Sequence, residues 1–270
     1  MTNAAPKKVT APGVRAMKGS GERIVALTAY DFMTAKLVDE AGADVILVGD
    51  SAAMVVLGYD STLPVTVDEM VMLTGAVARA KTRALVVGDM PFMSYQAEVA
   101  DAVRTAGRFV KDGGAAAVKL EGGAKVVDRV RAIVEAGIPV MGHIGLTPQS
   151  VHEFGGYRIQ GRSDDARAKL LADARALDEA GCFSLVLEAM PSALGTEITE
   201  AVSMPTIGIG AGASCDGQVL VINDILGYTT GRAARFVRTY GDARSLVLDA
   251  AKGFAADVRS GAYPNEDESY

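Results

Sequence analysis

VILVGDS, residues 45–51, is an unbroken apolar run that ends in an acid. Four later stretches have the same form: ALVVGDM (84–90), AVKLEGG (117–123), PVMGHIG (139–145) and SLVLEAM (184–190). Continuous apolar strands are typical of a parallel sheet that is buried on both faces. The five runs therefore predict strands of such a sheet. Each run brings an ionisable side chain to the point where its strand ends: Asp50, Asp89, Glu121, His143 and Glu188.

Strand-like and helical segments alternate along the chain. Strands are predicted over 24–30, 43–50, 84–90, 115–121, 138–144, 183–188, 204–210 and 218–223, and helices over 32–41, 67–81, 96–112, 124–136, 164–180 and 192–202. Several of these helices stop at a glycine, which fits the left-handed position after a helix. The alternation predicts a parallel sheet with right-handed crossovers. Eight strands favour a closed (β/α)8 barrel, with a doubly wound open sheet as the alternative.

The chain has 270 residues, a common length for one such barrel, and no linker or low-complexity break divides it. We expect an N-terminal arm with a short helix under the barrel floor (1–22), a catalytic barrel (23–260) and an acidic tail (261–270). The tail is expected to be mobile or to form a small lid at a subunit contact. The connections 51–66 and 145–163 are longer than packing requires, and long ordered loops on a barrel are usually functional.

Composition excludes several classes of protein. Hydrophobic residues make up 49% of the chain and aromatic residues 6%, with no Trp, which suits an aliphatic barrel core. The formal charge is −6, so a basic nucleic-acid surface is not expected. Two separated cysteines form no disulfide framework and indicate a reducing, cytoplasmic setting. No uncharged apolar run approaches the roughly 20 residues of a membrane-spanning helix. A basic N-terminal transit peptide is the alternative to the arm.

Residues at the carboxyl ends of barrel strands converge on one rim, where barrel enzymes hold their active sites. Five ionisable groups delivered to that rim are hard to explain by packing and predict an active site. Asp50 and Asp89 come from neighbouring strands. Carboxylates without thiolate or paired histidine partners suit a hard ion, with Mg²⁺ the first choice. The alternative is that each aspartate caps the turn or helix that follows it.

Lys119 and Glu121 lie two positions apart, so both face the barrel lumen. A buried lysine requires an acid or an anionic ligand. Beside a metal ion, Lys119 would hold the carboxylate of a substrate. A structural Lys–Glu pair and a Schiff-base lysine are the alternatives.

His143 has no second histidine at ligand spacing, so a zinc site is not expected. We assign it a supporting role, with a hydrogen-bonded core histidine as the alternative. Glu188 is reached through four apolar positions and would be poorly hydrated, which suits a general base. Its alternative role is the N-cap of the helix at 192–202. The glycine-rich stretch 206–217 is consistent with phosphate binding or with close packing.

Taken together, these segments resemble the ketopantoate hydroxymethyltransferase family from about Ile24 to Pro264. The matching segments are LTAYD (27–31), LVGDS (47–51), STLPVT (61–66), PFM (91–93), VKLEGG (118–123), GHIGLTPQS (142–150), FGGYRIQGR (154–162), LVLE (185–188) and IGIGAG (207–212). The resemblance implies a (β/α)8 barrel assembled as a homodecamer. It also implies an Mg²⁺-dependent reaction in which 5,10-methylenetetrahydrofolate donates a hydroxymethyl group to 3-methyl-2-oxobutanoate. The product is 2-dehydropantoate, on the route to pantothenate and coenzyme A.

The resemblance assigns roles to individual residues. Asp50 and Asp89 match the metal-binding aspartates, and Glu121 matches the third acidic position at the metal. Ser51 and Lys119 match residues that hold the oxo-acid, together with Asp50 and Asp89. Glu188 matches the base.

The chain departs from the family pattern in two places, neither of which carries a proposed chemical group. Ala52 and Ala53 stand where the family often has Leu-Gly, and 229–240 (TTGRAARFVRTY) follows the family pattern only loosely. These changes bear on details of loop packing and of subunit contacts.

Two other classes of protein fit parts of the pattern. One is an Mg²⁺-dependent carbon–carbon lyase or mutase of the phosphoenolpyruvate mutase and isocitrate lyase type, which typically has a reactive cysteine loop. Cys182 and Cys215 do not lie in such a loop. The other is a non-catalytic barrel whose strand-end charges only pair with each other.

Overall fold

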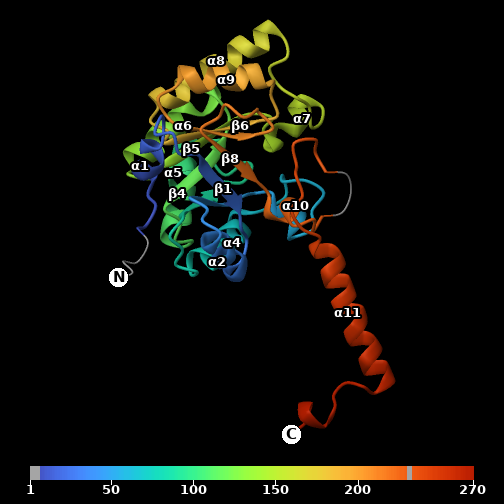
Figure 1. The fold of residues 1–270 in the computed structure, drawn as a ribbon. Helices are drawn as coiled ribbons and strands as arrows, with labels where there is room; N and C mark the ends of the chain where they lie inside the picture. The colour runs from blue at the N-terminus through green and yellow to red at the C-terminus, as the bar shows by residue number, and fades with distance from the viewer. Residues whose placement is uncertain (1–6, 230–232) are drawn as a thin grey trace, which may run out of the picture. The chain divides into compact units, whose positions relative to one another are not determined.

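The computed structural model describes residues 7–229 and 233–270 (Figure 1). The first six residues of the expected N-terminal arm lie outside the described residues, as do positions 230–232 of the stretch TTGRAARFVRTY. The described residues group into two compact units, which divide between Val221 and Ile222. Residues 222–260, which the sequence assigns to the barrel domain, therefore group with the expected tail.

The first unit contains a closed barrel of eight parallel strands in chain order. They are β1 (Ile24–Thr28), β2 (Val45–Val48), β3 (Leu85–Asp89), β4 (Ala117–Glu121), β5 (Val140–Gly145), β6 (Ser184–Glu188), β7 (Thr206–Ile209) and β8 (Gly217–Leu220). β1 pairs with β8 over four residues, which closes the ring. The predicted (β/α)8 barrel is confirmed, and the open sheet is wrong.

All six predicted helices are present in the first unit. They are α2 (Phe32–Glu40), α4 (Val67–Ala78), α5 (Val99–Lys111), α6 (Val127–Glu135) after the 3-10 turn η1 (Ala124–Val126), α8 (Asp164–Glu179) and α9 (Ser192–Ala201). The two long connections contain short helices: α3 (Ala52–Val55) in the first, and η2 (Pro148–Ser150) with α7 (Val151–Phe154) in the second. None of the helices in the described part of the chain is long and apolar enough to cross a membrane.

The second unit contains α10 (Ile222–Ile225), α11 (Ala243–Ser260) and η3 (Glu266–Glu268). No helix was predicted over 243–260. α11 begins after its cap Asp242 and ends at Gly261, and none of its residues is buried. The helix–glycine–strand pattern that marks the barrel helices has no counterpart here, because no strand follows α11.

Aliphatic side chains fill the barrel below the rim. Ala26, Val45, Leu85, Met141 and Val219 belong to one buried cluster. The short N-terminal helix α1 (Ala11–Ala16) places Ala11 and Val14 in the same cluster. The expected core of small aliphatic residues is therefore present, and it supports the charged residues at the strand ends from below.

Gly88, next to Asp89 in β3, lies against the side of the Phe109 ring. A Cβ at this position would lie 2.4 Å from Phe109 Cδ1, inside a fully buried contact. We expect Gly88→Ala to lower the free energy of unfolding by about 1–3 kcal/mol, because the ring has to move in a close-packed core. Urea denaturation measures this loss.

Gly107 in α5 provides the matched control. A Cβ there would meet nothing within 4 Å. Gly107→Ala is expected to raise the free energy of unfolding by about 0.5–1 kcal/mol, because alanine loses less backbone entropy in a helix. Equal effects of the two substitutions would contradict the packing argument.

Candidate active site

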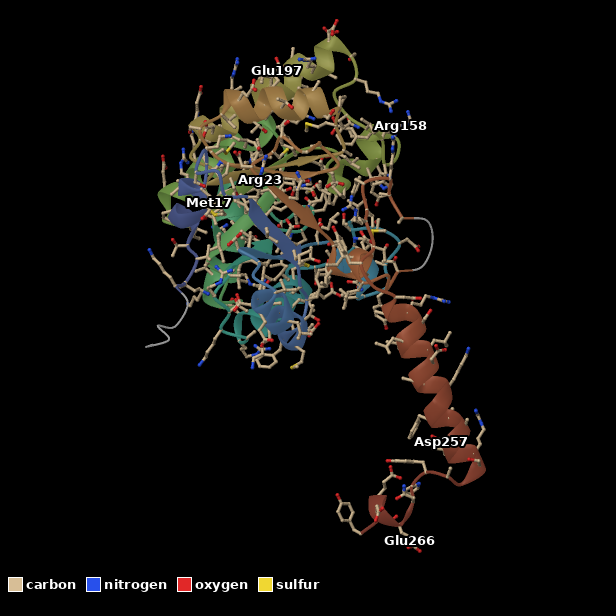
Figure 2. All side chains as sticks on the ribbon, in the orientation of Figure 1. Met17, Arg23, Arg158, Glu197, Asp257 and Glu266 are labelled. Carbon is tan, nitrogen blue, oxygen red and sulfur yellow. The ribbon has the colours of Figure 1, made fainter. Side chains whose placement is uncertain are left out.

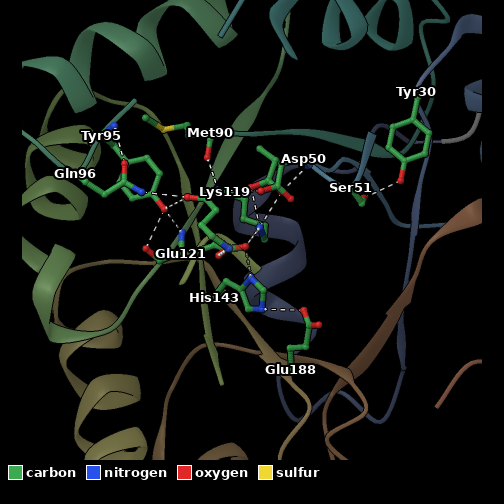
Figure 3. Close-up of polar contacts among 12 residues, drawn as sticks. Tyr30, Asp50, Ser51, Met90, Tyr95, Gln96, Lys119, Glu121, His143 and Glu188 are labelled. Atoms are coloured by element: carbon green, nitrogen blue, oxygen red, sulfur yellow. Dashed lines mark hydrogen bonds and ion pairs between the residues drawn. The ribbon is translucent and has the colours of Figure 1, made fainter. Parts of the chain in front are cut away.

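The predicted site residues meet at the carboxyl-end rim of the barrel (Figure 3). Asp89 and Glu188 end β3 and β6, whereas Asp50 follows β2 after one glycine. The other predicted residues come from β4 (Lys119 and Glu121), from β5 (His143) and from the turn after β2 (Ser51). The five ionisable residues from β2 to β5 are buried, and the Glu188 side chain is 15% exposed. The sequence therefore predicted which side chains come together.

Asp50 and Asp89 are adjacent, as expected for neighbouring strands. The Asp50 backbone N–H donates to Asp89 Oδ2 at 3.0 Å. Helix α3 has Ser51 as its N-cap, and helix α5 has Glu98. Neither aspartate caps a helix, so a helix-capping role does not explain the pair.

Lys119 pairs mainly with Asp89. Its Nζ lies 2.7 Å from Asp89 Oδ1 and 2.8 Å from Oδ2, and 3.6 Å from Glu121 Oε1. Burial alone would lower the pKa of this amine, but the carboxylates of Asp89, Glu121 and Asp50 raise it above its ordinary value. Lys119 is therefore held as a cation, which disfavours a Schiff-base role because that role requires a neutral amine.

His143 lies between two carboxylates (Figure 3). Its Nδ1 is 3.4 Å from Glu121 Oε1, and its Nε2 is 3.2 Å from Glu188 Oε2. Burial and Lys119 both lower the pKa of the imidazole, but Glu121 and Glu188 outweigh them and raise it to about 9. The ring thus connects Glu188 with Glu121. Helix α9 has Pro191 as its N-cap, so Glu188 does not cap it.

Ser51 lies beside the aspartate pair. Its hydroxyl is 2.8 Å from the Tyr30 hydroxyl, which comes from the turn after β1. This contact fixes the direction of the serine side chain at the rim.

Gln149 was not among the predicted site residues, yet it contacts two of the acids. Its Nε2 donates to Asp50 Oδ2 and to the Met90 carbonyl, both at 3.0 Å, and its backbone N–H donates to Glu121 Oε2 at 3.0 Å. The Tyr95 hydroxyl, 2.7 Å from Gln149 Oε1, accepts the Glu121 N–H. Gln149 is neutral and follows no strand directly. The signals for it were its position in the long 145–163 loop and in the matching segment GHIGLTPQS (142–150).

The amide of Gln149 has one orientation that suits its neighbours. Met90 offers only a carbonyl, so Gln149 Nε2 must face it. At the other end, the Tyr95 N–H donates to Gln96 Oε1, and Gln96 Nε2 therefore faces Gln149 Oε1 at 3.1 Å. The network thus keeps a donor directed at Asp50.

Negative charge is in excess at the rim. Burial, and then Asp89 and Glu121, raise the pKa of Asp50 well above its ordinary value. Four carboxylates (Asp50, Asp89, Glu121 and Glu188) face one ammonium and one imidazole.

The donor set has the chemistry of a site for a hard cation. Within residues 7–229 and 233–270, no three His, Cys, Asp or Glu side chains are arranged to hold one metal ion together. Two adjacent carboxylates still fit Mg²⁺, which characteristically takes one or two carboxylates and leaves its other positions to water and substrate.

The two cysteines are not reactive groups of the site. Both are buried, and burial raises the pKa of Cys182 to about 12 and that of Cys215 above its ordinary value. A reactive thiol requires the opposite shift. In the glycine-rich stretch, a Cβ at Gly217 would lie 2.4 Å from the Ile24 carbonyl oxygen, so close packing accounts for that glycine.

Two solved structures superimpose on this chain over almost their whole length. A phosphonopyruvate hydrolase in complex with oxalate and Mg²⁺ superimposes with a TM-score of 0.62 at 14% identity, covering 96% of this chain and 92% of that chain. A 2,3-dimethylmalate lyase, a member of the phosphoenolpyruvate mutase/isocitrate lyase superfamily, superimposes with a TM-score of 0.61 at 17% identity, over 98% and 93% of the two chains. The protein is thus a (β/α)8 barrel with a charged carboxyl-end rim.

Sequence comparisons identify the family. The family model for ketopantoate hydroxymethyltransferase matches residues 8–266. The 3-methyl-2-oxobutanoate hydroxymethyltransferase of Geobacter metallireducens is 54% identical, over 98% of this chain and 99% of that protein. The enzyme of the same name from Thermobifida fusca is 56% identical, over 98% and 95% of the two chains. The chain belongs to the ketopantoate hydroxymethyltransferase family.

Proposed function

We propose that the protein transfers a hydroxymethyl group from 5,10-methylenetetrahydrofolate to 3-methyl-2-oxobutanoate. The product is 2-dehydropantoate, which serves pantothenate and coenzyme A synthesis. The observation that carries the proposal is the meeting of Asp50, Asp89, Lys119 and Glu188 at one rim, in a chain that belongs to this family. Together they offer an anion-binding cation, a pair of metal ligands and a base.

Asp50 and Asp89 would hold Mg²⁺, with Glu121 as the third acidic position. When bound there, the ion supplies Lewis-acid polarisation of the keto and carboxylate oxygens of the oxo-acid. Glu121 Oε2 accepts the Gln149 N–H, and Oε1 faces Lys119 and His143. These contacts let Glu121 fix the groups around the metal position.

Lys119 and Ser51 would hold the oxo-acid. The buried Lys119 ammonium, which already pairs with Asp89, would also offer a charged hydrogen-bond donor to the carboxylate of the substrate. The Ser51 hydroxyl, fixed by Tyr30, orients the same group. These contacts direct C3 of the oxo-acid toward the far side of the rim, where Glu188 lies.

Glu188 would act as the base. It removes the C3 proton, and the C3–H electron pair becomes the enolate. Water adds to the one-carbon unit as its two C–N bonds break, so that tetrahydrofolate leaves with the protons of the water and formaldehyde remains. The enolate forms a bond to the formaldehyde carbon, and the resulting alkoxide takes the proton from Glu188. His143, 3.2 Å from Glu188 Oε2, orients the carboxylate.

The proposed function is tested by two measurements on the wild-type protein. Proton NMR in D2O, with 3-methyl-2-oxobutanoate and no folate, should show exchange of the C3 hydrogen that depends on Mg²⁺ and stops with a chelator. Adding methylenetetrahydrofolate should give 2-dehydropantoate. Absence of both reactions would overturn the proposal, and cleavage of a dicarboxylate without folate would favour a lyase.

Gln149 is expected to act on the metal through Asp50. Gln149→Met keeps the length of the side chain but removes the donor to Asp50 Oδ2. We expect Mg²⁺ affinity in the presence of the oxo-acid to fall by about 10- to 100-fold, as for other groups that orient a metal ligand. Isothermal titration calorimetry measures the change.

Gln160→Met in the same loop is the control, because within the described part of the chain the Gln160 amide donates to the Arg158 carbonyl and to none of the site acids. Similar losses of affinity in the two variants would contradict the role of Gln149.

The homodecamer and the cytoplasmic location implied by the family resemblance stay predictions. We infer the decamer from that resemblance alone. Multi-angle light scattering of the purified chain, which has a mass of 28.0 kDa, would measure the number of subunits.

A further inference from the structure

The second substrate has a direct route to the oxo-acid over the mouth of the barrel. The aliphatic cluster fills the barrel below the rim and blocks an approach from that side. Two cavities of about 160 and 460 Å³ lie beside the ends of β4 and β5, and the second reaches Glu121 and Gln149 at one edge of the site. Neither is lined by Asp50, Asp89, Lys119 or Glu188. The mouth of the barrel opens above these four residues, so it offers the donor the direct approach.

The stretch 157–160 contacts two opposite sides of the barrel mouth. The Gln160 N–H donates to the Ala189 carbonyl at 2.9 Å, in the turn after β6. The Tyr157 hydroxyl, three residues earlier, lies 4.0 Å from Met54 Sδ in α3, which follows β2. β2 and β6 are four strands apart in either direction around the ring, so they lie on opposite sides. The short stretch 157–160 therefore crosses the mouth.

Tyr157 is an exposed aromatic ring close to the charged site. Its exposed fraction is 54%, and that of Met54 is 41%. Burial of the remainder, and the carboxylates of Asp50, Glu188 and Glu121, raise the pKa of its phenol. The ring is therefore within electrostatic reach of acids from both sides of the barrel. The exposed part of the Tyr157 side chain offers aromatic surface at the mouth of the barrel, where the second substrate approaches.

We propose that Tyr157, with Met54 beside it, is the platform on which the pterin ring system of the one-carbon donor stacks. This assignment rests on the proposed function. A flat heterocycle gains from an aromatic face whatever its hydrogen-bonding pattern, and this position directs the one-carbon unit into the lumen toward C3 of the oxo-acid. Tyr157 thereby selects a planar heterocyclic donor.

Steady-state kinetics with methylenetetrahydrofolate test the platform. We expect Tyr157→Ala to raise the KM for the donor by about 5- to 100-fold, the range that loss of one stacking ring produces. Tyr157→Phe keeps the ring and should stay within about twofold of the wild type. Met54→Ala should raise the same KM by a smaller factor. The factor by which Tyr157→Ala raises the donor KM should far exceed the factor by which it changes the rate of C3 hydrogen exchange. Exchange requires only the oxo-acid, so loss of the donor platform should not affect it.

Arg158→Ala provides the matched control. Arg158 is the next residue of the same segment, and its side chain points away from the barrel (Figure 2). This variant should leave the donor KM within about twofold of the wild-type value. An unchanged donor KM in Tyr157→Ala would overturn the inference, as would an equal loss of exchange or an equal effect of Arg158→Ala. Absence of wild-type turnover would instead count against the proposed function.

Discussion

Glu188→Gln is expected to slow exchange of the C3 hydrogen of 3-methyl-2-oxobutanoate by about 10²- to 10⁴-fold, the usual contribution of a positioned general base. Glutamine has nearly the same shape and can still contact His143, which lies 3.2 Å from Glu188 Oε2. It cannot accept a proton. Exchange is followed by proton NMR in D2O with Mg²⁺ and without folate, so that only proton transfer is measured.

Binding of the oxo-acid and of Mg²⁺ should survive this substitution, because their proposed ligands lie on β3 and β4 and in the turn after β2. Glu197→Gln is the control. Glu197 is a surface residue of α9, paired with Arg167, and its substitution should leave exchange unchanged. Normal exchange in Glu188→Gln would remove Glu188 from the role of base.

Lys119→Met is expected to lower the free energy of unfolding in the absence of metal by about 3–5 kcal/mol. The Lys119 ammonium lies 2.7 Å from the Asp89 carboxylate, and both side chains are almost completely buried. Removing the ammonium leaves the carboxylates of Asp89 and Glu121 buried without their cation. The resulting loss in the free energy of unfolding is far larger than the net stabilisation that the intact ion pair provides. Urea denaturation with a chelator present measures the loss.

A double-mutant cycle isolates the pair. Asp89→Asn combined with Lys119→Met removes both charges and should recover part of the loss, since residues in contact are not additive. Lys125→Met is the matched control, because Lys125 and Glu153 form an ion pair that is exposed to solvent. Its effect should be well below that of Lys119→Met, since surface pairs contribute little. Equal losses of unfolding free energy in Lys119→Met and Lys125→Met would show that burial of the Lys119 pair makes no difference to stability.

The barrel and most of its rim could be predicted because both depend on local sequence patterns. Apolar runs of strand length and glycines after helices recur along the chain, and each strand end carries its own polar residue. Asp50 and Asp89 had to be neighbours once their strands were consecutive. The position of Glu188 at the same rim follows from closure of the ring.

Other features depend on contacts that no local pattern indicates. Lys119 pairs with Asp89 because the parallel register aligns these two residues across β3 and β4, whereas the sequence offered a Lys119–Glu121 pair only as an alternative. Gln149 reaches Asp50 only because a long loop folds back over the rim. Helix α11 follows the last strand and has no buried face, so the pattern that marked the other helices does not apply to it.

Closure of the ring also makes activity a reporter of folding. A chain segment that ended before β6 would contain every proposed metal ligand but no base, and a segment that began after β3 would contain the base without the aspartates. The last pairing, of β1 with β8, joins the two ends of the barrel sequence, and such distant contacts form late and slowly. During refolding, proton exchange on the oxo-acid should therefore reappear only with the final step, after most helical structure has returned.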